Sequence, residues 1–226
     1  MVKKNNAHKP LTFLTNELSF PSVEDANAEG LLAVGGDLSP ERLMLAYKNG
    51  IFPWFNEGSL ILWWSPDPRM VLYPERIKVS KSMRKVLNSH QFTLTKNSCF
   101  ETVIDQCALV KRAGQEGTWI TDEMKEAYLK LNEKGYAHSY EVWEEGTIVG
   151  GLYGIDLGHI FCGESMFSLV SNASKFAFIQ LAKELHQKNY DLIDCQLYTK
   201  HLESLGAEEI PRTEFYKILN KNKLVQ

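Results

Sequence analysis

Residues 138–167, HSYEVWEEGTIVGGLYGIDLGHIFCGESMF, restrict the possible fold more than any other part of the chain. Three segments rich in aromatic and aliphatic residues alternate there with turn sequences at residues 145–146 and 157–158, which predicts a meander of three antiparallel strands. A polar loop, SLVSNASK, a helical pattern over residues 175–189 and a strand-like segment, YDLIDCQL, come next. A meander, a helix and a returning strand, with one strand parallel to its neighbour, predict an α+β fold.

The N-terminal part of the chain differs from the rest, because it holds most of the prolines and three of the five tryptophans. Within it, LSPERLMLAYKNG has the signals of a helix: Ser39 suits the N-cap, Pro40 the first helical position and Gly50 the position after the end. We therefore predict a small N-terminal domain at residues 1–74 and a larger domain at residues 75–226.

Composition excludes several classes of protein. The 25 Lys and Arg residues against 28 Asp and Glu give a net charge of −3, so any nucleic-acid surface must be a local patch. The four cysteines have no CxxC spacing, which is typical of reduced thiols. Polar residues interrupt LTFLTNELSF too early for a signal peptide, and no apolar run approaches the length of a membrane span. These features predict a cytoplasmic protein without a membrane partner.

Two carboxylates lie where the hydrophobic pattern predicts aliphatic side chains: Glu164 in HIFCGESMF and Asp194 in YDLIDCQL. An ionised carboxylate without a partner is very costly to bury, so such positions are usually paired, protonated or functional. If strands that are neighbours in sequence are also neighbours in space, the two carboxylates could face one cleft.

Both carboxylates have a functional and a structural interpretation. Regular alternation would project Asp194 and Gln196 from the same face of a strand, where a carboxylate beside a carboxamide could polarise a nucleophile. Alternatively, Asp194 caps a backbone turn and Gln196 is solvated. Gly163 would let a ligand approach closely beside Glu164, whereas the structural alternative for Glu164 is a buried ion pair with Lys or Arg.

Three further groups of residues are candidates for binding. Trp54 and Trp119 lie in segments flanked by proline or glycine, where an indole would stack on a nucleobase or else fill a domain interface. An apolar set would form either plain core or a pocket; it comprises Met166, Phe178, Leu181, Leu185 and Ile193. The densest basic patch would be either a solvated face or a phosphate contact; it comprises Arg76, Lys78, Lys81, Arg84 and Lys85.

Several motifs that carry other chemistries are missing from the sequence. It contains no GxxxxGK[ST], GxGxxG, HExxH or GxSxG, and its six histidines have no ligand spacing. We therefore expect no metal site and no cofactor.

Nine segments, taken in order, resemble the leucyl/phenylalanyl-tRNA–protein transferases: GLLAVGGDLSPERLMLAYKNGIFPWF, ILWWSPDPRMVL, EGTWIT, HSYEVW, VGGLYG, IFCGESMFS, NASK, LIDCQ and SLGAEEIPR. The resemblance covers nearly the whole chain. It implies a GNAT-like (acyl-CoA N-acyltransferase) fold for the larger domain. It also implies transfer of Leu or Phe, and less readily Met, from aminoacyl-tRNA to proteins that begin with Arg or Lys. The product would enter the N-degron pathway of protein degradation.

The resemblance also implies a role for each candidate residue. Asp194 and Gln196 would help to remove a proton from the acceptor amine, and Glu164 would hold that amine or its cationic side chain. Trp54 and Trp119 would stack on the terminal adenosine, and the basic patch would hold the acceptor stem of the tRNA. The pocket for the transferred side chain would comprise Leu152, Met166, Phe178, Leu181 and Ile193. An aminoacyl ester is already activated, so this exchange needs neither ATP nor a metal, and we expect the enzyme to be a monomer.

Two other functions fit parts of the sequence. A GNAT-type acetyltransferase would bind the pyrophosphate of acetyl-CoA with a [QR]xxGx[GA] loop, but the corresponding segment here, SLVSNASK, has no glycine. A non-catalytic module would bind N-terminal Arg or Lys through Glu164 and Asp194 without turnover, although the intact pair of Asp194 and Gln196 weighs against it. Leu152 and Phe178 differ from the pocket residues of better-known members, which leaves the preference among Leu, Phe and Met open.

Overall fold

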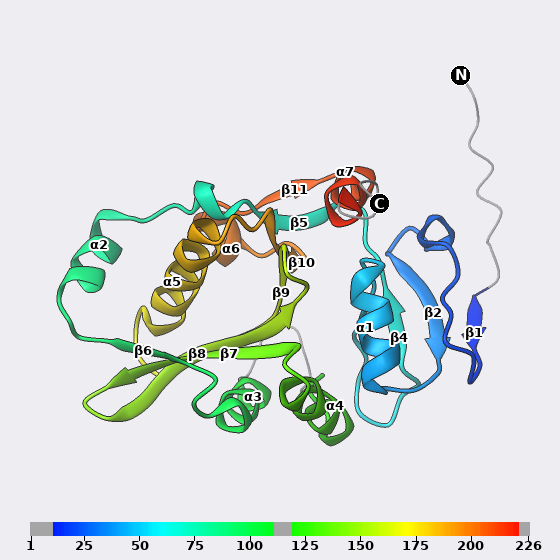
Figure 1. Ribbon diagram of the computed structural model, residues 1–226, viewed down its shortest axis with the longest axis horizontal. Helices are drawn as coiled ribbons and strands as arrows, with labels where there is room; N and C mark the ends of the chain where they lie inside the picture. The colour runs from blue at the N-terminus through cyan, green and yellow to red at the C-terminus, as the bar shows by residue number, and fades with distance from the viewer. Residues whose placement is uncertain (1–10, 111–118, 222–226) are drawn as a thin grey trace.

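The computed structural model describes residues 11–110 and 119–221, which form two β-sheets with helices packed around them (Figure 1). The smaller sheet has the strand order β1-β2-β4-β3. Its strands are β1 (Thr12–Leu14), β2 (Leu31–Gly35), β3 (Phe52–Pro53) and β4 (Leu62–Trp64), and helix α1 (Pro40–Lys48) connects β2 to β3.

The larger sheet has seven strands in the order β11-β5-β10-β9-β8-β7-β6. The strands are β5 (Arg69–Leu72), β6 (Thr93–Lys96), β7 (Ala137–Glu144), β8 (Thr147–Asp156), β9 (Ile160–Ser168), β10 (Leu192–Gln196) and β11 (Glu208–Ile210). Strands β7, β8 and β9 pair antiparallel, as the meander predicted, and β10 pairs parallel to β9. The predicted α+β class is confirmed, and the order of meander, helix and returning strand is the one expected of a GNAT-like fold.

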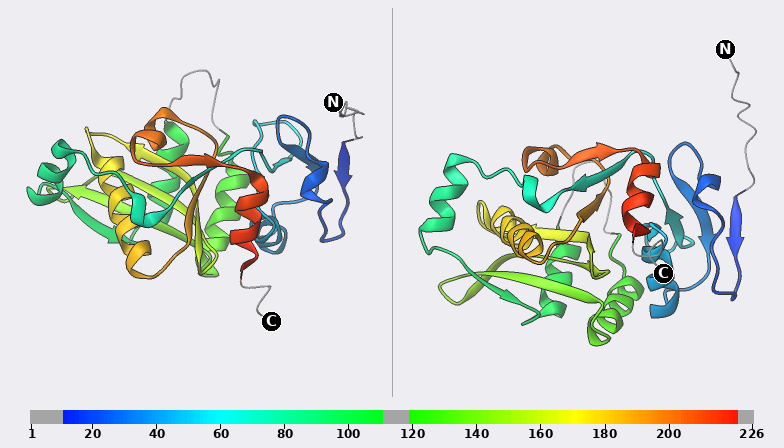
Figure 2. Two further views of the ribbon diagram at one scale, coloured as in Figure 1. Left: turned by 90° about the horizontal axis from the view of Figure 1, so that it is seen from above. Right: turned by 45° about the horizontal axis from the view of Figure 1, so that its top comes forward.

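Helices cover both faces of the larger sheet. Figure 2 shows α5 (Ala173–Gln187) on one face, with α3 (Phe100–Leu109) and α4 (Asp122–Glu133) on the other. The remaining helical segments are α2 (Lys81–Asn88), α6 (Lys200–Ser204), α7 (Arg212–Leu219) and two 3₁₀ turns, η1 (Val23–Asp25) and η2 (Pro74–Arg76). No helix in the described part of the chain is both long and apolar enough to cross a membrane.

Local signals account for the helix starts. The hydroxyl oxygens of Ser39, Ser80 and Thr121 accept hydrogen bonds from backbone N–H groups in the first turns of α1, α2 and α4. Such caps satisfy donors that have no partner within the helix. After α1 the chain turns at Gly50, whose φ of +66° lies in the left-handed region that glycine adopts readily. The helix limits read from the sequence are therefore confirmed in this region.

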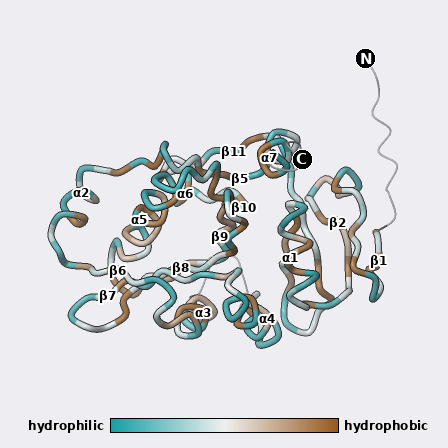
Figure 3. The backbone as a smooth tube through the Cα atoms, viewed as in Figure 1, coloured by the Kyte–Doolittle hydropathy of each residue, from teal (hydrophilic) through white to brown (hydrophobic). Residues whose placement is uncertain are grey.

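The two sheets share part of their hydrophobic core. Buried residues of the smaller sheet, such as Leu32 and Trp63, belong to the same cluster as Ile155 and Leu192 of the larger sheet and Phe215 of α7. Figure 3 shows hydrophobic residues along β9 and β10, the strands that carry the two carboxylates. The domain boundary at residues 74 and 75 stays a prediction, whereas the switch between sheets occurs between β4 and β5, so that β5 belongs to the larger sheet.

Candidate active site

A cavity of about 430 Å³ lies where the two sheets meet. Its wall includes Phe52 and Pro53 of β3 and Trp54 just after it, together with side chains of β8, β9, β10, α5 and the segment that follows β10. Most of the binding candidates from the sequence line it: Trp54, Trp119, Leu152, Met166, Phe178 and Leu181. The cavity is therefore built from segments that are far apart in the sequence.

One predicted pocket residue lies elsewhere. Ile193 is fully buried and does not line the cavity, because it lies in the middle of β10 between Leu72 and Phe161 on the neighbouring strands. It packs in the same hydrophobic cluster as Phe178 and Leu181, so it supports the pocket wall from behind.

Glu164 lines the cavity and is only 9% exposed. Its Oε2 accepts a hydrogen bond of 2.7 Å from the hydroxyl of Tyr128, and its Oε1 accepts one of 2.8 Å from Nε2 of Gln196. The hydroxyl groups of Tyr128 and Tyr47 form a further hydrogen bond. Glu164 makes no ion pair with any residue in the described ranges, so the structural alternative offered for it is not what the fold contains.

Burial raises the pKa of Glu164 from 4.5 to about 7. Desolvation is the largest cause, hydrogen bonds from Tyr128, Tyr47 and Gln196 act in the opposite direction, and the negative charge of Asp194 raises the pKa further. Burial and the charge of Glu164 raise the pKa of both tyrosines well above 10, so both keep their protons and act as donors. A carboxyl group with a pKa close to neutral can both take up and release a proton at physiological pH.

Asp194 is more deeply buried than Glu164 and has a different environment. Its Oδ1 accepts a hydrogen bond of 2.8 Å from Nε of Arg69, and its Oδ2 accepts one of 2.7 Å from Nη2 of the same side chain. Both side chains are almost inaccessible to water, and burial tends to lower the pKa of Arg69, but the charge of Asp194 outweighs it and raises that pKa overall. The guanidinium of Arg69 thus keeps its positive charge. Asp194 does not line the cavity.

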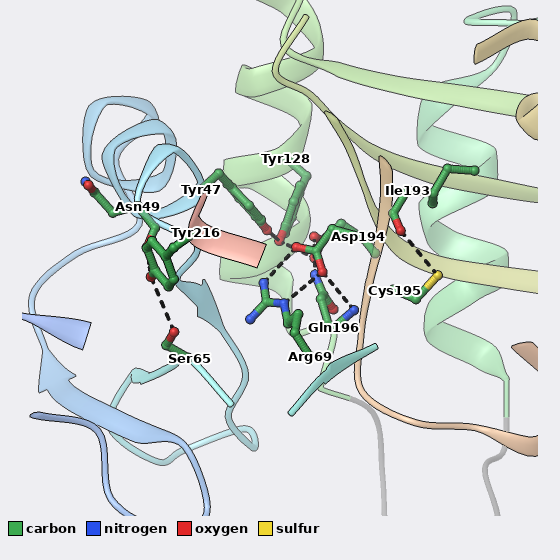
Figure 4. Close-up of polar contacts among 11 residues, drawn as sticks. Tyr47, Asn49, Ser65, Arg69, Tyr128, Ile193, Asp194, Cys195, Gln196 and Tyr216 are labelled. Carbon is green, nitrogen blue, oxygen red and sulfur yellow. Dashed lines mark hydrogen bonds and ion pairs between the residues drawn. The ribbon is translucent and has the colours of Figure 1, made fainter. Parts of the chain in front are cut away.

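Gln196 departs from the regular strand that the sequence predicted. Its backbone has a φ of +64°, and the pairing of β10 with β5 shifts register between Asp194 and Gln196. The expected projection of the two side chains from one face is therefore wrong, because the irregular backbone at residues 195 and 196 breaks the alternation. Gln196 faces Glu164 and the cavity. Asp194 faces Arg69 (Figure 4).

The turn-capping role that the sequence offered for Asp194 is also present, because its Oδ1 accepts a hydrogen bond of 3.0 Å from the backbone N–H of Gln196. Figure 4 shows Asp194 between Arg69 and Gln196, with the hydroxyl groups of Tyr47 and Tyr128 directed toward one another. A continuous series of hydrogen bonds thus runs from Arg69 through Asp194, Gln196 and Glu164 to the two tyrosines.

The two predicted stacking residues differ in exposure. Trp54 is 37% exposed, and its ring lies 5.7 Å from that of Trp64 at a tilt of 59°. Trp119 is 6% exposed and packs in the core, although one side of it lines the cavity. Trp119 is therefore not the exposed loop indole that its glycine-flanked segment suggested.

The basic patch lies away from the cavity, on η2, α2 and the segment between them. Its side chains are exposed: Arg76, Lys78, Lys81, Arg84 and Lys85. Arg76 is already engaged, because it donates to Glu208 at 2.7 Å and lies over the ring of Tyr73 at 4.1 Å. In Figure 1, α2 lies at the far end of the larger sheet from α1.

Sequence reasoning missed three residues of this site: Arg69, Tyr47 and Tyr128. Arg69 follows SPDP, which predicts only an extended segment, and Tyr47 and Tyr128 fit the apolar faces of α1 and α4. None carries a local signal for its role, because each acquires its partner from a distant part of the chain.

Comparison with known proteins gives consistent results over most of the chain. Residues 71–220 match the family described as leucyl/phenylalanyl-tRNA protein transferase, and residues 36–67 match the N-terminal domain of that family. A leucyl/phenylalanyl-tRNA–protein transferase of Flavobacterium johnsoniae is 62% identical over 207 residues, covering 92% of this chain and 98% of the relative. One from Nitrosomonas eutropha is 53% identical and covers 92% of this chain and 89% of the relative.

Solved structures are more distant. L-PGS from Bacillus licheniformis has 13% identity and a TM-score of 0.40, with 76% of this chain and 57% of that chain covered. A GCN5-related N-acetyltransferase from Kribbella flavida has 11% identity and a TM-score of 0.33, with 74% and 59% covered. These likenesses are too weak to assign a function.

Proposed function

The chain belongs to the leucyl/phenylalanyl-tRNA–protein transferase family, and we propose that it transfers Leu or Phe, and less readily Met, from aminoacyl-tRNA to the α-amino group of proteins that begin with Arg or Lys. It is a transferase enzyme, with an aminoacyl-tRNA as donor and a protein as acceptor. The observation that carries the finer assignment is a cavity that joins an apolar wall to a buried carboxyl group with a pKa of about 7.

The reaction requires one proton to leave before a new bond can form. The acceptor amine has an ordinary pKa of about 8 and is largely protonated at neutral pH, so it must lose a proton to become a nucleophile. The amine nitrogen then attacks the ester carbonyl carbon, the C–N bond forms and the bond to the ribose oxygen breaks. A second proton passes from the nitrogen to that ribose oxygen, so the products are an amide and a free tRNA hydroxyl.

Glu164 is the group that takes the first proton. It lines the cavity, and its pKa of about 7 is matched to an ammonium group with a pKa of about 8. Gln196 orients Glu164 through its 2.8 Å hydrogen bond, and Asp194 holds Gln196. This division differs from the one expected from the sequence, where Asp194 acted on the proton, because both oxygens of Asp194 are engaged by Arg69.

The apolar wall receives the transferred side chain. Leu152, Met166, Phe178 and Leu181 line this side of the cavity, and flexible methionine and leucine side chains can repack around either a branched or an aromatic guest. Trp54 stacks on the terminal adenosine, and Trp119 contacts it only through the side that lines the cavity. The basic patch holds the acceptor stem without reading its sequence.

We assign the enzyme to the cytoplasm as a monomer whose products enter the N-degron pathway. A direct test combines the protein with labelled Phe-tRNA or Leu-tRNA and a peptide that begins with Arg. We expect label on the peptide, and none on a matched peptide that begins with Asp. Transfer that persists after the tRNA is digested with RNase, or that requires acetyl-CoA, would contradict the assignment. Peptide binding without transfer would indicate a non-catalytic module instead.

A further inference from the structure

Arg69 is one of the most thoroughly enclosed side chains of the described structure, with an exposure of 1%. Its guanidinium carbon lies 4.8 Å from the ring centroid of Phe52 on one side and 4.8 Å from that of Phe215 on another. Phe52 belongs to β3 in the smaller sheet, and Phe215 belongs to α7. Aromatic faces attract a planar cation and fix its orientation, so Arg69 has little freedom to turn.

The guanidinium in turn fixes Asp194. Two parallel N–H···O bonds of 2.8 and 2.7 Å join the pair, and this bidentate geometry restrains the carboxylate in both position and orientation. The restrained Oδ1 also accepts the backbone N–H of Gln196 at 3.0 Å. Asp194 therefore connects Arg69 to the backbone of a residue that lines the cavity.

That backbone is in a conformation that a glutamine rarely adopts. A φ of +64° is unfavourable for a side chain with a Cβ, and such conformations persist only where the surroundings hold them. Here the result is useful, because it brings Nε2 of Gln196 to 2.8 Å from Oε1 of Glu164.

We propose that Arg69 is a positioning residue of the transfer reaction, acting through Asp194 to hold Gln196 in the conformation that places its side-chain amide against Glu164. This inference rests on the proposed function, because it assigns Arg69 to the same proton-transfer step. Nothing in it requires Arg69 to touch either substrate, and Arg69 does not line the cavity.

Lysine cannot replace Arg69 in this role, since an ammonium group lacks the planar fork that engages both oxygens of Asp194. Loss of the fork would let Asp194 turn and release Gln196 from its strained conformation. The hydrogen bond from Gln196 lowers the pKa of Glu164, so its loss should raise that pKa. The groups around Glu164 that bear on this are Tyr47 of α1, Tyr128 of α4, Cys162 of β9, Asp194 and Gln196 of β10, and Arg69 of β5.

The test compares R69K with R42K, because Arg42 is the other fully buried arginine that pairs with an aspartate in the described structure and it does not line the cavity. Transfer from Phe-tRNA to an Arg peptide is measured from pH 5.5 to 9, with a melting curve for each variant. For R69K we expect kcat at least ~10-fold lower, with KM for Phe-tRNA within about twofold of wild type. The pH at half-maximal kcat should also move upward. R42K should keep the wild-type kcat and pH profile.

An R69K protein with the wild-type kcat and pH profile would overturn the proposal. If R69K does not fold, the double variant R69M/D194L replaces the pair by apolar groups, an exchange that buried ion pairs often tolerate. We expect this variant to fold and to transfer at least ~10-fold more slowly. Transfer at the wild-type rate would show that the pair serves stability alone. Failure of the wild-type protein itself to transfer would refute the proposed function and the role of Arg69 in it, whereas failure of the Arg69 proposal alone would leave wild-type transfer intact.

Discussion

Arg42 of helix α1 and Arg69 of strand β5 are buried to the same extent but have different surroundings. Each is almost fully buried, each forms an ion pair with an aspartate, and neither Nη1 atom has a partner among the described residues. The partner of Arg42 is Asp37, whose side chain is 49% exposed. Arg42 also donates a hydrogen bond of 2.9 Å to the backbone oxygen of Thr15. The partner of Arg69 is as buried as Arg69 itself.

The two ion pairs therefore differ in the exposure of the aspartate and not in that of the arginine. We attribute the different roles of Arg42 and Arg69 to this difference. Water solvates and screens Asp37, so its pair contributes modestly. Water has almost no access to Asp194, so its two oxygens accept their hydrogen bonds from Arg69 and Gln196, and the positions of these groups become tightly coupled.

The largest expected effect is on stability. D194N leaves Arg69 as an uncompensated buried charge, and we expect the free energy of unfolding to fall by about 3–5 kcal/mol. D37N removes a partner that water can largely replace, and we expect a loss of about 1 kcal/mol or less. Urea unfolding at pH 7 measures both. Equal losses would break the distinction between the two regions.

A second effect appears in the pH dependence of stability, where the two regions should have opposite signs. The pKa of Glu164 is raised in the folded protein, so its contribution is fully present below pH 4.5 and is lost as the pH rises through about 7. The step from 4.5 to about 7 corresponds to about 3 kcal/mol, at roughly 1.4 kcal/mol for each tenfold change in proton affinity. The free energy of unfolding of E164Q, minus that of wild type, should therefore be larger at pH 8 than at pH 4.5.

Asp37 should show the reverse sign. Burial tends to raise its pKa, but hydrogen bonds from Ser39 and Arg42 outweigh this and lower it below 3.8. Its contribution is thus present above pH 3.8 and is lost as the pH falls through the lowered value. D37N should therefore be less stable than wild type above pH 3.8 and should approach the wild-type stability at more acid pH. Thermal melts of wild type, E164Q and D37N between pH 3 and pH 8 would reveal a common sign if the comparison fails.

The smallest effect is expected from the exposed basic patch, whose side chains would meet tRNA phosphates that are also exposed to water. The triple variant K81S/R84S/K85S on α2 should raise KM for Phe-tRNA by about 10-fold and leave kcat unchanged. A plot of the logarithm of the tRNA binding constant against the logarithm of the salt concentration should become less steep, by about 2 in slope. Lys134 and Lys221, which lie outside the basic patch and near carboxylates, supply the control K134S/K221S. An equal rise in KM for the control would mean that net charge, rather than the patch, attracts the tRNA.

Local patterns predicted most of the fold, because caps, turns and apolar periodicity are short-range signals. Ser39 caps α1 where expected, and Gly146 lies at the expected turn with a φ of +78°. The two carboxylates were also recognisable, because a charge in an apolar strand is an anomaly in the sequence itself.

The internal arrangement of the site was not predictable in this way. The pairing of β5 with β10 brings Arg69 to Asp194 across 125 positions of sequence, and Arg69 then determines which carboxylate is committed to an ion pair. No sequence signal predicts the shift of register at Cys195 either, yet this shift directs the side chains of Asp194 and Gln196 to different partners. Long-range partners, rather than residue types, decided the roles.

The cavity wall shared by both sheets also determines how the molecule should respond to heat. Because Phe52 and Pro53 come from one sheet and Glu164 and Gln196 from the other, an occupant of the cavity contacts both sheets at once. Saturation at a hundredfold excess over Kd adds about 2.7 kcal/mol to the folded state. This added free energy of unfolding stabilises both sheets together, so bound substrate should make them melt in a single calorimetric transition.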